Sequence, residues 1–147
     1  MALGFLRRNP NYKLDIMQFM LGWRGSYLDD EIPEIFRKEV IEWVREIQRL
    51  GELLMGLLCE GLGVEANRLK EMTCLEGKSM VGNYYLHCPQ PDLTVGLAHH
   101  TDPAVLMVSQ QGHVGGLQVN YVGGCLDVKP LPGALVINIG DLLQVNI

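Results

Sequence analysis

Two short polar patterns stand out in the sequence, Asn83-x-Tyr85 and His100-x-Asp102. Successive side chains of an extended strand point to opposite faces, so residues two apart share a face. If both segments are extended, Asn83 and Tyr85 point to one side of their strand, and His100 and Asp102 do the same in theirs. An imidazole and a carboxylate on one face can meet a single metal ion. His100 and Asp102 are therefore candidate metal ligands.

This histidine–aspartate pair is open to two interpretations. One imidazole and one carboxylate are two of the three protein ligands in the 2-His-1-carboxylate triad, which binds Fe(II) and leaves coordination positions open. Alternatively, the pair marks only a strand end, where His100 caps a backbone carbonyl and Asp102 starts a turn before Pro103. The apolar runs on both sides favour the metal site, because the polar triplet interrupts sequence that otherwise suits a sheet.

A long amphipathic helix is the clearest element of the first half. Acidic residues at 29–31 and a proline soon after suit the positive end of a helix. Apolar residues then recur at steps of three and four over residues 36–58, with charged residues on the other side. We expect this helix to end near Gly61 or Gly63, and a second, short helix to cover residues 65–72.

Residues 1–28 give a weaker signal. A weak amphipathic pattern predicts one short helix in otherwise irregular chain, with apolar positions at Met17, Phe19, Met20 and Trp23. No strand is indicated before the long helix.

The character of the sequence changes from Lys78 onward. Short apolar runs alternate with Gly, Pro and Asn, as is typical of antiparallel strands joined by turns; the runs are MVGNYY, AVLMV, LQVNYV, LDV and ALVINI. Gly123-Gly124 suits a two-residue hairpin loop, because glycine accepts positive φ angles. We therefore expect an α+β fold, with residues 1–76 as a helical N-terminal part, residues 77–147 as a partial jelly roll, and the whole as a single compact unit.

Composition argues against several classes of partner. The chain has 147 residues, enough for one domain with a core. Its net charge is −5 at pH 7 and it has no basic stripe, which argues against nucleic acid or an anionic membrane. No apolar run approaches the length of a membrane span and no targeting segment is evident, so we expect a cytoplasmic protein. The four cysteines form no C-x-x-C pair and are expected to be free thiols.

A longer series of motifs carries a resemblance to a known family. In order along the chain they are EIPEIFRKEVIEW, NYY, CPQPDLTVGL, HTDP, VGGLQV and PGALVINIGDLLQ. Together they closely resemble plant 2-oxoglutarate- and Fe(II)-dependent dioxygenases, in particular the 1-aminocyclopropane-1-carboxylate oxidase homologues and desacetoxyvindoline 4-hydroxylase-like enzymes. The resemblance covers most of the chain and implies the incomplete double-stranded β-helix, or jelly-roll, core of that family, with the long helix packed on it.

The resemblance also implies residue roles and a reaction. His100 and Asp102 match two iron ligands, while Asn83 and Tyr85 match positions beside 2-oxoglutarate, to which Tyr85 would hydrogen-bond. The implied cofactors are Fe(II) and, as co-substrate, 2-oxoglutarate, with ascorbate as a further one. The implied reaction couples decarboxylation of 2-oxoglutarate, which gives succinate and CO2, to hydroxylation or another oxidation of a small organic substrate of plant secondary metabolism. In such enzymes the iron carries the hard chemistry and the protein orients the substrate.

The sequence departs from the family pattern after the β region. The family's second iron-binding histidine, and the arginine-x-serine that binds 2-oxoglutarate, lie further along the chain; no histidine and no such arginine motif follows His113 here. We interpret the chain as truncated at both ends. The alternative is a non-catalytic fragment that acts at most as a small-molecule binding or interaction module, with self-association through an open sheet edge. A cupin-like module with another metal would require more histidine than His100 supplies.

Overall fold

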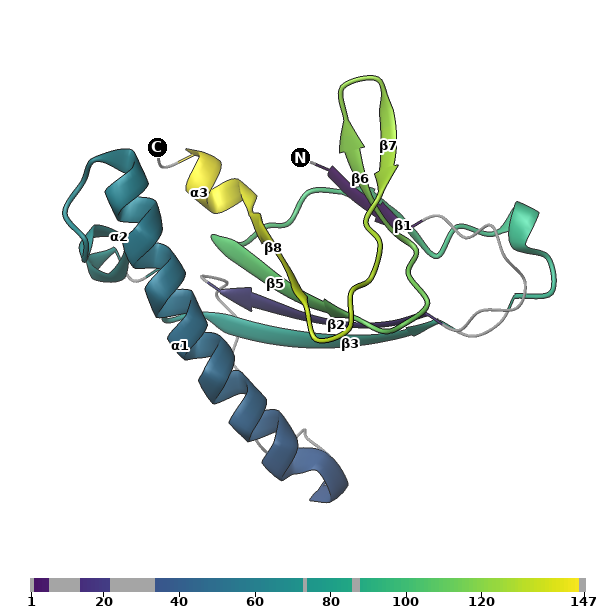
Figure 1. The fold of residues 1–147 in the computed structure, drawn as a ribbon, viewed down its shortest axis with the longest axis horizontal. Helices are drawn as coiled ribbons and strands as arrows, with labels where there is room; N and C mark the ends of the chain where they lie inside the picture. The colour runs from purple at the N-terminus through teal and green to yellow at the C-terminus, as the bar shows by residue number, and fades with distance from the viewer. Residues whose placement is uncertain (1, 6–13, 22–33, 73, 86–87, 146–147) are drawn as a thin grey trace.

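Helices and two antiparallel sheets make up the computed structural model of the chain, which describes residues 2–5, 14–21, 34–72, 74–85 and 88–145 (Figure 1). The predicted mixture of helices and antiparallel strands is confirmed. The helices are α1 (Arg37–Leu62), α2 (Arg68–Glu71) and α3 (Asp141–Val145), with 3₁₀ turns at Glu34–Phe36 and Pro91–Leu93. The strands are β1 (Ala2–Phe5), β2 (Leu14–Leu21), β3 (Lys78–Tyr85), β4 (Leu97–His100), β5 (Leu106–Gln111), β6 (Leu117–Tyr121), β7 (Gly124–Asp127) and β8 (Leu135–Ile139).

The strands form two four-stranded sheets. Sheet A has the order β4-β1-β6-β7, and sheet B has the order β3-β2-β5-β8. All the pairs are antiparallel. Because β1 lies between β4 and β6, and β2 lies between β3 and β5, the N-terminal part of the chain supplies an inner strand to each sheet.

The N-terminal part corrects two expectations from the sequence. The predicted short helix is wrong for Met17, Phe19 and Met20, because they lie in strand β2; Trp23 lies outside the described residues. The expectation that no strand precedes the long helix is also wrong, because β1 and β2 both do. In a short, mostly apolar run such as that of β2, hydrophobic periodicity does not distinguish a helix from a strand. Pairing on both sides, with β3 and β5, decides the outcome here.

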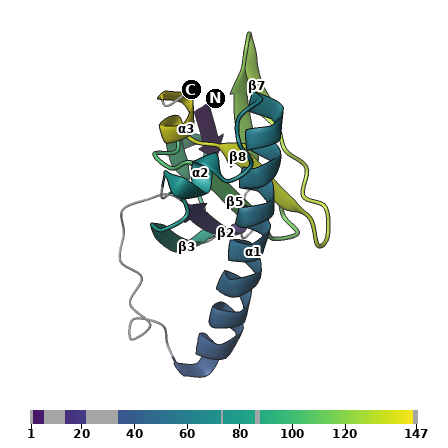
Figure 2. The ribbon, with the colours of Figure 1, turned by 90° about the vertical axis from the view of Figure 1, so that its left-hand side faces the viewer.

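Helix α1 lies across sheet B (Figures 1 and 2). Its buried residues are Ile47, Gly51, Met55 and Cys59, which are four apart and therefore line one face. The helix ends at a glycine in the left-handed region: Gly63 has φ 68°, and the amide of Val64 donates to the carbonyl of Cys59 at 3.0 Å. This is the Schellman type of helix end, which satisfies a terminal carbonyl.

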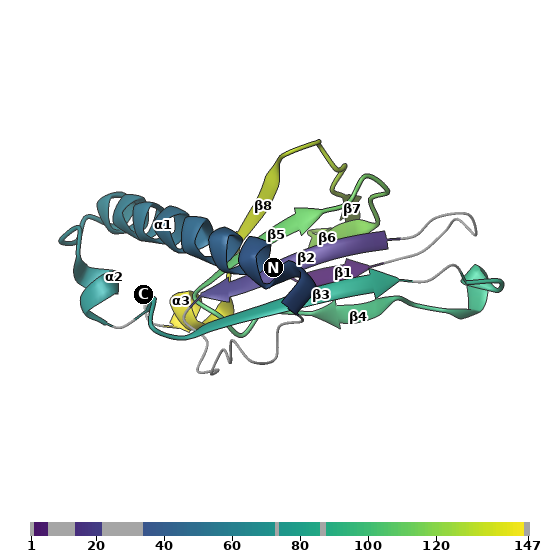
Figure 3. The ribbon, with the colours of Figure 1, turned by 90° about the horizontal axis from the view of Figure 1, so that it is seen from below.

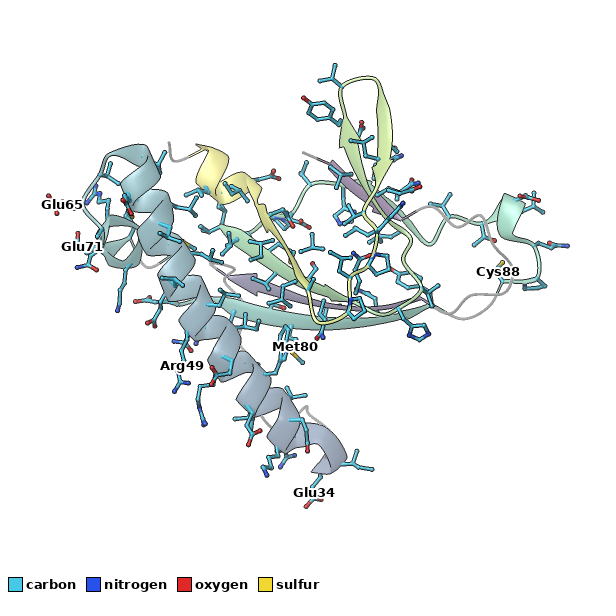
Figure 4. The ribbon with its side chains drawn as sticks, in the orientation of Figure 1. Glu34, Arg49, Glu65, Glu71, Met80 and Cys88 are labelled. Carbon is cyan, nitrogen blue, oxygen red and sulfur yellow. The ribbon has the colours of Figure 1, made fainter. Side chains whose placement is uncertain are left out.

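The two faces of sheet B pack against different layers. Leu106 and Val108 of β5 belong to one buried cluster with Met55 of α1 and Leu143 of α3, so this face carries the helices. Met80 of β3 packs against the same cluster, and Figure 4 shows it on the side of β3 that α1 covers. Burying each such side chain contributes roughly 1.5–3 kcal/mol.

The other face of sheet B looks toward sheet A. Leu117 of β6 is buried there, with Val136 of β8 and Tyr85 of β3 packed against it. These contacts join strands of different sheets, so the sheets face each other at this point. Val136 and Asn138 lie two apart on β8 and thus share this inner face. Val136 and Asn138 therefore lie between the two sheets.

Candidate metal centre

The histidine–aspartate pattern lies where β4 ends, at an edge of sheet A. Strand β4 stops at His100, so Asp102 follows the strand rather than lying within it, contrary to the fully extended segment expected from the sequence. The position of Asp102 is fixed by backbone contacts instead: its carbonyl accepts a hydrogen bond from the amide of Asp141 at 2.8 Å. The Asp102 side chain is only 4% exposed, while the His100 side chain is about one-third exposed.

His100 Nε2 and Asp102 Oδ1 face each other, and each can donate an electron pair. His100 Nδ1 lies 2.9 Å from the carbonyl oxygen of Ala98. A carbonyl oxygen only accepts, so this contact places the ring proton on Nδ1 and leaves the lone pair on Nε2. That nitrogen lies 3.6 Å from Asp102 Oδ1, beyond hydrogen-bond distance. In the neutral ring, Nε2 and the carboxylate oxygen are both electron-pair donors, and a cation between them would satisfy both.

The distance between these two atoms suits a transition-metal ion. Nitrogen and oxygen ligands bind such ions at about 2.1 Å, so two ligands of one ion lie roughly 3.0 to 4.2 Å apart. The 3.6 Å between Nε2 and Oδ1 falls inside this range. The contact of Nδ1 with a backbone carbonyl is also the usual way in which proteins orient a metal-binding histidine. His100 and Asp102 therefore fit two positions around one metal ion.

Sequence reasoning missed Asn138, which contacts this pair from β8. Its Nδ2 donates to Asp102 Oδ2 at 2.8 Å, and both side chains are buried. Strand β8 lies in the apolar run ALVINI, in which polar and apolar residues do not alternate. The sequence pattern therefore does not distinguish its single polar residue. A polar side chain on the inner face of a buried strand is the signal that could have found it.

The start of α3 supports the same turn. Thr101 Oγ1 donates to Asp141 Oδ2 at 2.6 Å. Gly140 follows β8 and lies against the segment after β4. Its backbone is so close to the carbonyl oxygens of Ala104 and Asp102 that a Cβ would lie 2.1 and 2.7 Å from them. Only glycine fits at this close approach of two backbones.

The second pattern, Asn83-x-Tyr85, lies on β3, the edge strand of sheet B. In Figure 3, β3 and β4 run along the same side of the two sheets. Tyr85 packs against Leu117 of the opposite sheet, so it faces the layer between the sheets, and alternation puts Asn83 on the same face. Burial raises the pKa of the Tyr85 phenol above its ordinary value.

Other histidines of the described chain lie apart from this pair. His99 is exposed on β4, and His113 is exposed in the turn before β6. Across residues 2–5, 14–21, 34–72, 74–85 and 88–145, no group of three or more His, Cys, Asp or Glu side chains is arranged to hold a metal ion. The described residues thus offer two candidate ligands.

Comparison with known proteins connects this geometry to a family. The 2OG-Fe(II) oxygenase superfamily profile matches residues 76–146, which include both polar patterns and the whole of β8. The chain belongs to the 2OG-Fe(II) oxygenase superfamily. This family uses Fe(II) and 2-oxoglutarate as its cofactors, and the predicted resemblance is confirmed at this level.

Individual relatives of the chain come from Arabidopsis thaliana. The chain is 47% identical over 145 residues to 1-aminocyclopropane-1-carboxylate oxidase homolog 11, an alignment that covers 92% of this chain and 40% of the relative. It is 47% identical over 115 residues to homolog 1, covering 78% of this chain and 32% of the relative. The chain therefore spans between about a third and two fifths of the length of these proteins. No solved structure matches it, and no helix among the described residues is long and apolar enough to cross a membrane.

Proposed function

We propose that the chain carries part of the catalytic centre of an Fe(II)- and 2-oxoglutarate-dependent dioxygenase, with His100 and Asp102 as iron ligands. The observation that carries this proposal is the pair of facing acceptors, His100 Nε2 and Asp102 Oδ1, held 3.6 Å apart in a chain of this family. His100 is oriented by the carbonyl of Ala98, and Asp102 by Asn138. When bound, the iron would supply the oxidation of a small organic substrate coupled to conversion of 2-oxoglutarate to succinate and CO2.

Asn83 and Tyr85 are proposed to bind 2-oxoglutarate. Both lie on the face of β3 that looks toward sheet A, and the two strands that carry the patterns run along the same side of the molecule. A phenol is protonated at neutral pH, so the O–H group of Tyr85 can donate to a carboxylate of the co-substrate. Ascorbate, which would keep iron reduced, belongs to the same proposal.

The architecture proposed for this function is an incomplete jelly roll backed by the amphipathic helix α1. Two facing antiparallel sheets and a helix on the outer face of sheet B support it. We take residues 77–147 as the part that resembles the catalytic core, and residues 1–76 as the part that adds α1 and two inner strands, in a single unit. Cys59, Cys74 and Cys125 are free thiols, which suits a reducing compartment such as the cytoplasm.

The test is anaerobic titration of the purified chain with Fe(II), with and without 2-oxoglutarate, followed by visible absorption. A 2-oxo acid that chelates Fe(II) gives a charge-transfer band, and the proposal expects this band in the unaltered chain. The His100→Ala, Asp102→Ala double variant should lose it. His99→Ala is the matched control, because His99 is the neighbouring histidine of β4 but is exposed to solvent, and it should keep the band.

Two results would refute the metal site. One is a folded chain that gives no band at millimolar Fe(II) and 2-oxoglutarate. The other is a band that survives in the double variant, since the iron would then be held by other residues.

A non-catalytic binding or interaction module is the second candidate. It is favoured by the finding that the described residues contain no group of three metal-binding side chains. The edge strand β7 adds to it, because all four of its residues are exposed and, among the described residues, it pairs on one side only, with β6. Unpaired edges promote strand pairing between chains. Size-exclusion chromatography over a concentration series distinguishes the two: this candidate expects dimers or larger species without metal, whereas the first does not need them.

A further inference from the structure

The carboxylate of Asp102 has two oxygens in different surroundings. Oδ1 faces His100 Nε2 at 3.6 Å, and Oδ2 accepts a hydrogen bond from Asn138 Nδ2 at 2.8 Å. A carboxylate oxygen that accepts a hydrogen bond donates its electrons to a metal less readily than the other oxygen does. The hydrogen bond therefore holds Oδ2 to the protein, whereas Oδ1 is open toward His100.

Asn138 is buried at a cost that its role in the sheet does not explain. It is 7% exposed, it lies opposite Met107 in the pairing of β8 with β5, and its side-chain oxygen Oδ1 has no hydrogen-bond partner among the described residues. Leaving a buried polar atom unpaired is unfavourable. An apolar side chain in this place would avoid that cost, but it could not donate to Asp102.

The backbone around Asn138 leaves the amide little freedom to move away. Two residues further on, Gly140 donates from its amide to the carbonyl of Val105 at 3.1 Å, and the amide of Asp141 donates to the carbonyl of Asp102 at 2.8 Å. The end of β8 and the turn after β4 are thus joined by backbone hydrogen bonds just beyond the side-chain contact. The position of the Asn138 amide beside the Asp102 carboxylate is therefore fixed.

We propose that Asn138 is a positioning residue for the metal ligand Asp102. By holding Oδ2, it directs Oδ1 toward His100 and makes the carboxylate bind the metal through a single oxygen, so that further coordination positions stay open. This inference rests on the proposed metal site, and it concerns a residue that neither polar pattern in the sequence contains. Hydrogen-bond partners of metal ligands typically affect metal affinity by 10- to 100-fold.

The test compares metal affinity with metal-free stability in Asn138→Leu, which removes the amide at similar volume. Co(II) is the probe, because its visible absorption reports coordination without oxidation of the metal. Ser109→Ala is the matched control, since Ser109 is also a buried polar residue, on the neighbouring strand β5. We expect Co(II) to bind Asn138→Leu roughly 10- to 100-fold more weakly than the unaltered chain, and Ser109→Ala to bind it within about twofold of the unaltered chain.

Two results would overturn the proposal. One is unchanged Co(II) affinity in a folded Asn138→Leu. The other is an equal loss of affinity in Ser109→Ala, which would mark a general effect of sheet stability. If the leucine variant does not fold, Asn138→Ala, which adds no atoms to the packed site, replaces it. A variant that melts like the unaltered chain but binds Co(II) weakly supports positioning, because a purely structural residue would lower both.

A metal-free measurement separates this inference from the proposed function. Urea unfolding of Asn138→Leu, Asp102→Ala and the double variant gives the coupling between the two residues. We expect their effects on the unfolding equilibrium constant to depart from a simple product by about fivefold or more. If the unaltered chain binds no Co(II), the proposed metal site fails, and the pairing of Asn138 with Asp102 is decided by this coupling alone; an absent coupling overturns it.

Discussion

Replacing Gly140 with alanine perturbs the closest backbone approach in the candidate site. A Cβ at this position would lie 2.1 Å from the carbonyl oxygen of Ala104 and 2.7 Å from that of Asp102. Neither obstacle is a flexible side chain, so the backbone itself must move. Ordinary contact with an oxygen begins at roughly 3.4 Å, and because packed interiors leave no such free space, the start of α3 has to shift by about 1 Å.

The expected loss of stability follows from the bonds that this shift breaks. Three backbone hydrogen bonds join the two segments: Gly140 to Val105 at 3.1 Å, Asp141 to Asp102 at 2.8 Å, and Leu142 to Ala104 at 3.1 Å. Each contributes a net 0.5–1.5 kcal/mol or so, which gives roughly 1.5–4.5 kcal/mol in total. Typical domains unfold at about 5–15 kcal/mol, so the free energy of unfolding should fall by a large fraction.

Urea unfolding of the metal-free chain measures this effect directly, and Gly56→Ala is the control. Gly56 lies inside α1, and a Cβ there meets nothing within 4 Å. Alanine at Gly56 should therefore raise the free energy of unfolding by about 1 kcal/mol through helix propensity. The reasoning is refuted if Gly140→Ala unfolds within about 0.5 kcal/mol of the unaltered chain, the range of ordinary surface substitutions.

Two further substitutions test other parts of the structure. Met55→Ala removes one of the largest buried side chains of α1 and should cost about 2–5 kcal/mol in urea unfolding, whereas the exposed Leu53 should tolerate alanine. Burial raises the folded-state pKa of Tyr85, so its contribution to stability is present below pH of about 10 and is lost as pH rises through the folded value; Tyr85→Phe should flatten the loss of stability seen in alkaline urea titrations.

The strands of the second half were the most predictable part of the fold. The short apolar runs after Lys78, with Gly and Pro between them, correspond to β3 and β5–β8. The predicted hairpin joins β6 and β7, although its loop is Val122-Gly123 rather than Gly123-Gly124, because Tyr121 pairs with Gly124. Gly123 has φ 97°, the conformation for which a glycine was expected there. These features are local, so sequence patterns report them well.

The inner strands β1 and β2 could not be predicted in the same way. Their partners, β3 to β6, lie more than fifty residues away along the chain. No local pattern records such a pairing, and a short apolar run suits a helix as well as a strand. Asn138 was missed for a related reason: it lies 36 residues from Asp102, and only the packing of β8 beside β5 brings them together.

The place of β1 also bears on how a metal would be held. Strand β1 is the neighbour of β4 within sheet A, and its four residues, ALGF, include no side chain that binds metal ions. Because the described residues contain no group of three metal-binding side chains, a metal between His100 and Asp102 would leave several coordination positions open to other ligands. A 2-oxo acid that chelates through two oxygens would fill two of them, so metal and 2-oxoglutarate should bind cooperatively. Because such coupling is reciprocal, 2-oxoglutarate must raise metal affinity by the factor by which the metal raises 2-oxoglutarate affinity. Measuring both factors in one chain tests whether the two ligands share this site, since ligands bound at independent places would give factors of one.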